Sequence, residues 1–172
     1  MEALFADLII LLFAYLVPMY CANAVPILVH GTKPLDFGKK FRGKRVFGKG
    51  KTILGALAGI IGGTVAGTLF MLAFPQTQQL IPNYFALIAA LAAGAIIGDA
   101  VKSFFKRQLG FESGQRWLIA DQLDFIAGGL LLSLLVRVPE WQIVVVLLLA
   151  TAFIHLATNF AAYKLGLKKV PW

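Results

Sequence analysis

The sequence predicts an all-α integral membrane protein of about five transmembrane helices, and two observations lead to this fold class. Of its 172 residues, 59% are hydrophobic and only 14% are charged, whereas a soluble domain is about half apolar and a quarter charged. The apolar residues are also gathered into long uncharged runs that basic segments separate, which is typical of helices in lipid. We therefore interpret residues 1–172 as a single transmembrane domain.

The first uncharged run covers residues 8–29, and we place the first span at about 4–29. At about 1.5 Å per residue, this run is long enough to cross a bilayer. Pro18, Asn23 and Pro26 interrupt it, so we expect a kink or a broken end in its second half. Because no basic region precedes the run, we interpret it as a retained span and not as a removable signal.

The second uncharged run covers residues 52–98 and is too long for one span. A single helix of that length would extend roughly 70 Å, about twice the thickness of a bilayer. The polar break near residues 75–83 divides the run, which predicts spans at about 52–74 and 83–101. Four glycines recur every four residues in the first of these spans, and such a stripe favours close helix packing: Gly55, Gly59, Gly63 and Gly67.

The fourth span is unusual because it carries acids. Only twelve uncharged residues separate Asp124 from Arg137, or roughly 18 Å of helix against a hydrocarbon core of about 30 Å. A span at about 118–138 has sufficient length, but it places Asp121 and Asp124 at membrane depth. The fifth span is predicted at about 141–163.

The basic residues predict the orientation of the chain. With five spans, the loops 30–51 and 102–117 and the C-terminal tail lie on the same side, and together they hold 15 of the 16 Lys and Arg residues. The positive-inside rule makes that side cytoplasmic and the N-terminus external. The chain is then a multi-pass protein of the cell membrane, and its net charge of +8 needs no nucleic-acid partner.

Ionisable residues within a membrane are costly, and they are candidates for function. The predicted topology gathers several polar residues at the cytoplasmic ends of the spans, under the basic rim of the loops. This arrangement would form an acidic and amide-lined hollow that opens to the cytosol and sideways to lipid. The residues concerned are Asn23, Asp99, Asp121, Asp124, His155, Thr158 and Asn159.

Asp121 and Asp124 are three residues apart, so on a helix their carboxylates share one face. Carboxylates are preferred ligands of Mg²⁺, which predicts a metal site at this pair. Alternatively, the pair caps the helix, where negative charge meets the positive end of the helix dipole. Asp99 is either a third ligand or the ion-pair partner of Lys102.

Residues 47–52 read Phe-Gly-Lys-Gly-Lys-Thr, which invites a phosphate-loop interpretation. The spacing excludes the P-loop motif, because the first glycine would have to stand at Arg45. A basic, glycine-containing turn remains, and free amides before a helix can hold phosphate oxygens. Gly50, Lys51 and Thr52 are therefore candidate phosphate ligands, and the alternative is a solvated loop that is basic for topology only.

Three motifs together resemble the signature of phosphatidate cytidylyltransferases. They are Gly98-Asp99, Ser103-x-x-Lys106-Arg107 and Asp121-x-x-Asp124. Gln122 stands where that signature has arginine, and the fuller pattern is more similar to the archaeal branch, the CDP-archaeol synthases. This similarity extends over essentially the whole chain and includes Pro18-x-x-x-Ala22-Asn23, Gly48-x-Gly50-Lys51-Thr52-x-x-Gly55, Lys102-Ser103-Phe104, Asp121-Gln122-Leu123-Asp124 and Leu167-x-x-Val170-Pro171-Trp172.

The resemblance implies transfer of CMP from CTP to 2,3-di-O-geranylgeranylglyceryl phosphate, with release of pyrophosphate, in phospholipid biosynthesis. It implies that Mg²⁺ is the cofactor and that the partners are CTP, an isoprenoid lipid phosphate and membrane lipid. Asp121 and Asp124 would hold the metal with support from Asp99. The remaining site residues would contact the phosphates of CTP or of the lipid: Asn23, Gly50, Lys51, Thr52, Lys102, Ser103, Lys106, Arg107 and Asn159.

Two other functions stay open at this point. A CTP-dependent polyprenol kinase would carry out related chemistry, but its acceptor is an alcohol that needs a general base. A small membrane transporter would explain the spans and loops, but not two acids a turn apart beside Lys-Ser-x-x-Lys-Arg, and no internal inverted repeat is apparent. The sequence leaves the oligomeric state open.

Overall fold

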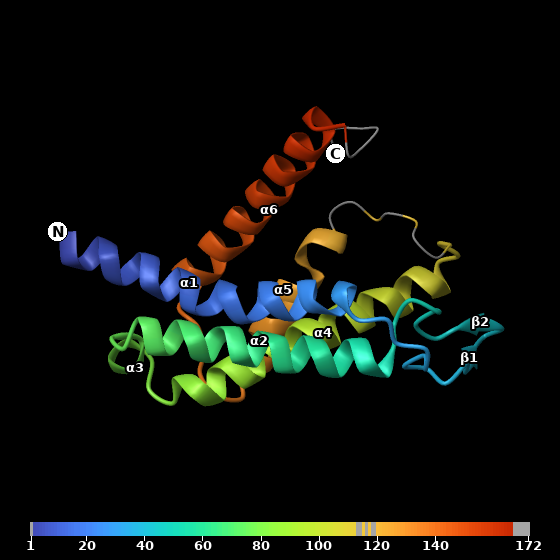
Figure 1. Cartoon of the computed structure of the whole chain (residues 1–172), viewed down its shortest axis with the longest axis horizontal. Coiled ribbons are helices and arrows are strands. Elements are labelled where there is room, and N and C mark those ends of the chain that lie inside the picture. Colours follow the sequence, from blue (N-terminus) through green and yellow to red (C-terminus); the bar gives the residue numbers. More distant parts are fainter. Residues whose placement is uncertain (1, 113–114, 116, 118–119, 167–172) are drawn as a thin grey trace.

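The structure, a computed structural model, describes residues 2–112, 115, 117 and 120–166, without the side chains of 2–4, 155, 158, 159 and 162. Within this part the fold is helical, with one short antiparallel hairpin (Figure 1). Helices α1 and α4 run in the same direction and α2 runs opposite to them, side by side (Figure 1). Within the part of the chain that the structure describes, three helical segments are long and apolar enough to cross a membrane: Phe5–Leu28, Ile53–Ala73 and Tyr84–Gln108.

Helix α1 (Glu2–Ala24) contains Pro18 and passes into a 3-10 turn at Val25–Leu28. The turn has Pro26 in its first positions. Proline lacks an amide hydrogen and therefore cannot continue the α-helical hydrogen-bond ladder. The broken end predicted for the first span is confirmed at this turn.

Helix α2 (Ile53–Ala73) packs against α1 through its glycine stripe, whose four members are all buried. A Cβ atom at Gly59 would lie 2.7 Å from the carbonyl oxygen of Ala22, and one at Gly63 would lie 2.5 Å from that of Pro18. Only a residue without a side chain permits this approach. The close packing predicted from the stripe is confirmed.

The next elements are α3 (Thr77–Leu80), at the polar break, and α4 (Tyr84–Gln108). Helix α4 is longer than the span predicted at 83–101, because it continues through seven residues of the predicted loop 102–117. Lys102, Ser103, Lys106 and Arg107 are therefore helical, and the prediction that they lie in a loop is wrong. The apolar pattern ends at residue 101, but the hydrogen-bonded helix continues, since Lys102 and Lys106 have ion-pair partners in the helical segment that follows.

Helix α5 covers Ala120–Ser133, which is 14 residues. It is shorter than the span predicted at 118–138, and its length of roughly 21 Å does not reach across a bilayer on its own. Helix α6 (Trp141–Lys164) follows. Its first turns pack on the bundle through Ile143, Leu147 and Thr151, and its second half leaves the other helices (Figure 1).

The segment between α1 and α2 forms a small hairpin of strands β1 (Lys40–Phe41) and β2 (Lys44–Arg45). Lys40 pairs with Arg45, and Phe41 pairs with Lys44. The hairpin lies beside the C-terminal end of α4, and α3 lies at the opposite end of the bundle (Figure 1). The basic loop is therefore placed next to the basic turns of α4.

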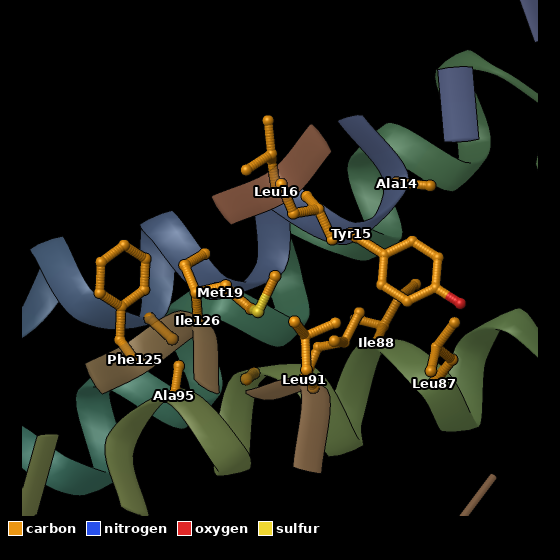
Figure 2. Close-up of a cluster of buried hydrophobic side chains, with 14 of the residues drawn as sticks. Ala14, Tyr15, Leu16, Met19, Leu87, Ile88, Leu91, Ala95, Phe125 and Ile126 are labelled. Carbon is orange, nitrogen blue, oxygen red and sulfur yellow. The ribbon is translucent and has the colours of Figure 1, made fainter. Parts of the chain in front are cut away.

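The core lies among α1, α4, α5 and α6. Figure 2 shows Met19 between Leu91 of α4 and Ile126 of α5, with Phe125 nearby. Tyr84 is fully buried and donates its hydroxyl hydrogen to the carbonyl oxygen of Ala14, at 2.8 Å. This core fixes α5 against α4, which positions the polar groups described next.

Candidate active site

Asp36 organises the basic loop. Its buried carboxylate accepts hydrogen bonds from the Arg45 guanidinium and from the amides of Gly38, Phe47 and Gly48. These hydrogen bonds, led by that of Arg45, hold the pKa of Asp36 well below its usual range. The hydrogen bonds fix the backbone that leads to Lys51. Sequence reasoning missed Asp36, although it is the lone acid in a segment with eight basic residues.

Gly48 has a φ angle of +92°, a conformation that glycine adopts without strain. A Cβ atom there would lie 3.4 Å from Nε of Arg107, so the loop contacts the last turn of α4 at this point. Arg107 donates to the carbonyl oxygen of Phe111 at 2.6 Å. Its buried Nε has no hydrogen-bond partner within the described part of the chain.

Three aspartates and three lysines form one partly buried network at the junction of the loop, α4 and α5. Lys51 of the loop pairs with Asp99 of α4. Lys102 follows one turn after Asp99, and its Nζ lies 3.2 Å from that carboxylate. The helix spacing of three residues places both side chains on one face.

Lys102 also joins α4 to α5. Its Nζ lies 3.1 Å from Asp121 and 2.7 Å from Asp124. Lys106, one turn further along α4, donates to both carboxylate oxygens of Asp121 at 3.0 Å. These pairs show that α4 and α5 are antiparallel, and the network balances three positive against three negative charges.

Asp121 and Asp124 differ in their surroundings. The amide of Trp117 donates to Asp121 at 2.7 Å, so this carboxylate caps the start of α5. The Asp124 side chain is only 5% exposed, and its Oδ2 is bound through the ion pair with Lys102 alone, within the described residues. The capping interpretation therefore fits Asp121, and Asp124 lies a turn deeper.

Two other predicted site residues have local hydrogen-bond partners, and a third lines cavities beside the network. The hydroxyl of Ser103 donates to the carbonyl oxygen of Asp99 at 2.8 Å. Thr52 caps α2, because its hydroxyl oxygen accepts from the amide of Gly55 at 3.1 Å. Gly50 precedes this cap and lines two of the cavities beside the network.

Three cavities meet at the network. A basic cavity of about 210 Å³ is lined by Gly50, Lys51, Lys102, Ser103, Lys106, Arg107 and Phe47. A mixed cavity of about 340 Å³ lies between the loop and α2 and contains Lys51 and Asp99 in its wall. An apolar cavity of about 540 Å³ lies between α4 and α5 and reaches Lys102 and Asp124. Lys102 thus belongs to both the basic and the apolar cavity.

The described residues do not form a site of three protein ligands for magnesium, but two of them suit an ion that substrate phosphates also hold. As the side chains lie here, no group of three His, Cys, Asp or Glu among the described residues is close enough to hold one ion. Asp121 and Asp124, however, both approach the same cationic nitrogen. Mg²⁺ is commonly held by one or two carboxylates together with substrate phosphates, and this pair suits that mode.

The structure describes the side chain of only one of the two amides predicted for the site. Asn23 lies half-buried in the last turn of α1 and is not among the residues lining the three cavities. Asn159 lies on α6, but its side chain is outside the described residues, as are those of His155 and Thr158 and the tail at 167–172.

A helical membrane protein whose partly buried carboxylates and lysines adjoin a basic cavity has the features of membrane enzymes that act on phosphorylated substrates. Residues 5–172 match the family model described as CarS-like, CDP-archaeol synthase. The chain belongs to this family, whose members are CTP-dependent cytidylyltransferases.

Curated relatives and a solved structure agree with this assignment. The CDP-archaeol synthase of Methanospirillum hungatei is 39% identical, with 91% of this chain and all of the relative covered. That of Methanocaldococcus jannaschii is also 39% identical, with coverages of 94% and 98%. A solved intramembrane enzyme of archaeal membrane lipid biosynthesis has a TM-score of 0.76 and 37% identity, with 86% of this chain and 91% of that chain covered. These findings favour the predicted nucleotidyltransferase over the kinase and the transporter.

Proposed function

We propose that the chain transfers the cytidylyl group of CTP to 2,3-di-O-geranylgeranylglyceryl phosphate at the network around Lys102. A phosphate oxygen of the lipid attacks the α-phosphorus of CTP. The bond from this phosphorus to the oxygen that bridges to the β-phosphate breaks, and pyrophosphate leaves. The products are the CDP-linked lipid and pyrophosphate.

The observation that carries this proposal is the meeting of a basic cavity and an apolar cavity at Lys102. The reaction joins a polyanionic nucleotide to an amphiphilic phosphate, so it needs both environments at one point. Two anions must approach each other, and positioned cations lower the cost of this approach. Because the nucleophile is already an anion near neutral pH, the chain needs no general base.

The basic side chains have different proposed roles, which depend on where they lie. Lys106 and Arg107 stand in the last turns of α4, and Lys51 lies at the end of the loop, around the same cavity. Their ammonium and guanidinium groups would hold the phosphates of CTP. Lys102 lies between this cavity and the lipid side, where it would contact the attacking phosphate.

Asp121 and Asp124 would hold Mg²⁺ together with the nucleotide phosphates, and Asp99 would support them through Lys51 and Lys102. The metal supplies charge neutralisation on the triphosphate. In the structure, Lys102 lies between the carboxylates. We infer that its ammonium turns toward the substrate phosphate when the metal is bound.

The orientation is part of the proposal. The last turn of α4, which contains Lys106 and Arg107, and the loop before α2 lie at the end of the bundle that carries the basic hairpin (Figure 1). The positive-inside rule makes this end cytoplasmic, where CTP is available. The active site therefore faces the cytoplasm.

The test uses purified protein in nanodiscs with CTP labelled on its α-phosphate, Mg²⁺ and either the unsaturated archaeal lipid phosphate or phosphatidate. We expect label in a CDP-lipid, equimolar pyrophosphate, and preference for the archaeal lipid. Parallel reactions with polyprenol provide the control. Release of CDP with phosphorylation of polyprenol, and no labelled lipid, would establish the kinase instead.

A further inference from the structure

We propose that the apolar cavity between α4 and α5 is the binding groove for an isoprenoid chain of the lipid phosphate, with the lipid's phosphate at Lys102. This inference rests on the proposed function and specifies where the acceptor binds. We call the cavity the α4–α5 groove. Its walls include Ile97, Val101 and Phe105 of α4 and Ala127 and Leu131 of α5.

The walls of the groove suit hydrocarbon and face the bilayer. Among its wall residues, Ile97 is 51% exposed and Leu131 is 68% exposed. Helix α4 is one of the segments long and apolar enough to cross a membrane, so these side chains lie among lipid chains. A lipid can therefore enter the groove sideways without passing through water.

The floor of the groove is made of backbone. A Cβ atom at Gly98 would lie 2.2 Å from the carbonyl oxygen of Asp124, and one at Gly128 would lie 2.3 Å from that of Gly94. The two helices thus touch without side chains between them, while larger side chains stand on both sides. The result is a channel with a closed base and an open face, of about 540 Å³, within the usual size of ligand pockets.

The charged end of the groove identifies the kind of lipid. Lys102 and Asp124 stand at this end, and Lys102 also lines the basic cavity with Lys106 and Arg107. An amphiphile with an apolar chain and a phosphate matches both cavities at once. A neutral bilayer lipid would leave the cationic side unmatched, so charge complementarity favours the phosphorylated substrate.

The depth of the groove agrees with a lipid in one leaflet. From Asp124 to Leu132 the chain advances eight residues along α5, or roughly 12 Å. Half of a hydrocarbon core of about 30 Å is roughly 15 Å. A chain that starts at Lys102 would therefore remain within the leaflet from which its headgroup came.

The kinetic test compares Ala127→Phe, which places a ring in the groove, with Ala86→Phe, on an exposed position near the other end of α4. For Ala127→Phe we expect the KM for the full-length lipid phosphate to rise at least about tenfold, with the KM for CTP unchanged. A short-chain lipid phosphate should be used equally well by both variants. Leu131→Trp serves as a second groove variant if Ala127→Phe does not fold.

A second readout is independent of turnover. The unmodified protein is irradiated with a lipid phosphate that carries a diazirine on its chain, and the labelled peptides are identified by mass spectrometry. We expect labels on α4 residues 97–105 and α5 residues 123–132, and competition by unlabelled lipid phosphate but not by phosphatidylcholine. The groove assignment would be wrong if both lipids reduced the labelling equally, or if labels appeared only elsewhere in the chain.

The two proposals fail differently. If the unmodified protein forms no CDP-lipid from CTP, the proposed function is wrong. If it does so and both phenylalanine variants keep the same KM for the full-length lipid, the function stands and the groove assignment is wrong.

Discussion

Asp124 is the residue whose environment is most specialised. Its carboxylate is almost completely buried, and Lys102 compensates its charge from 2.7 Å. Asp121 lies a turn closer to the loop end and also caps α5. Asp121 and Asp124, three residues apart, thus have different surroundings, and the deeper one is the stronger candidate for the proposed metal site.

We predict that Asp124→Asn lowers kcat about 100- to 1,000-fold, because the site loses a charge that is used at the reacting phosphates. Steady-state turnover with CTP and lipid phosphate measures this effect. The matched control is Glu140→Gln, which removes an exposed acid that pairs with Arg137. Near-normal turnover in Asp124→Asn, with the protein inserted and folded, would contradict the metal assignment.

The pair between Lys51 and Asp99 gives a second residue-scale prediction. Lys51→Met and Asp99→Asn should each raise the KM for CTP, since each removes part of the same contact. In the double variant the losses should fall short of the sum, with a coupling of about 0.5–3 kcal/mol. A double-mutant cycle on kcat/KM measures this coupling. Strict additivity would show that the two side chains act separately.

At the scale of elements, the basic loop is a folded unit and not a solvated linker. The carboxylate of Asp36 joins strand β2, through Arg45, to the turn at Gly48, and Thr52 pairs with Pro34 in an isolated bridge. The contact between Gly48 and Arg107 joins this unit to α4. The loop therefore presents Lys51 in a fixed place.

Asp36→Asn should destabilise this unit, because hydrogen bonds to a charged group are worth about 1.5–3 kcal/mol. We expect a lower Tm in detergent and a weaker affinity for CTP. The control is Glu112→Gln, an exposed acid outside the hairpin.

The same residue predicts a pH dependence. The pKa of Asp36 is lowered in the folded chain, so its stabilisation is fully present above the ordinary aspartate pKa of about 3.9. The stabilisation is lost as the pH falls through the lower folded pKa. The difference in Tm between the wild type and Asp36→Asn should shrink on acidification below about pH 4. A difference that stays constant down to pH 2 would contradict this role.

The close contact between α4 and α5 leads to a third prediction at the scale of elements. Gly98→Ala places a methyl group within 2.2 Å of a backbone oxygen, so the helices must separate and the network around Lys102 must open. We expect a loss of both thermal stability and turnover. Ala86→Leu adds more atoms on an exposed face of the same helix and should remain close to the wild type. Equal stability of Gly98→Ala and the wild type would refute the close contact.

At the scale of the whole molecule, basic residues gather at one end of the helix bundle. The hairpin and the basic turns of α4 lie at one end, and α3 lies at the other (Figure 1). Among the described residues, three segments are long and apolar enough to span a membrane. Helix α5 is shorter, and α6 leaves the bundle in its second half (Figure 1). Orientation in the membrane is therefore best measured at the two ends.

We predict opposite accessibility for cysteines at Lys40 and Gln78. After Cys21→Ser removes the free cysteine, Gln78→Cys should react with an impermeant maleimide in intact cells. Lys40→Cys should react only after permeabilisation if the basic end faces the cytoplasm, as the positive-inside rule predicts. The reverse pattern would place the active site outside.

The sequence by itself determined the class of fold, the basic segments and the candidate acids within the spans, because lipid demands uncharged runs and makes a charge within such a run conspicuous. It also determined the family, through motifs spread over the chain. Only the tertiary structure decided that Lys102 and Lys106 belong to a helix, that Asp36 organises the loop, and that α4 and α5 touch at glycines. These features depend on contacts between residues far apart in the chain. Hydrogen bonds and ion pairs extend α4 beyond its apolar pattern, and they join three separate segments into one network.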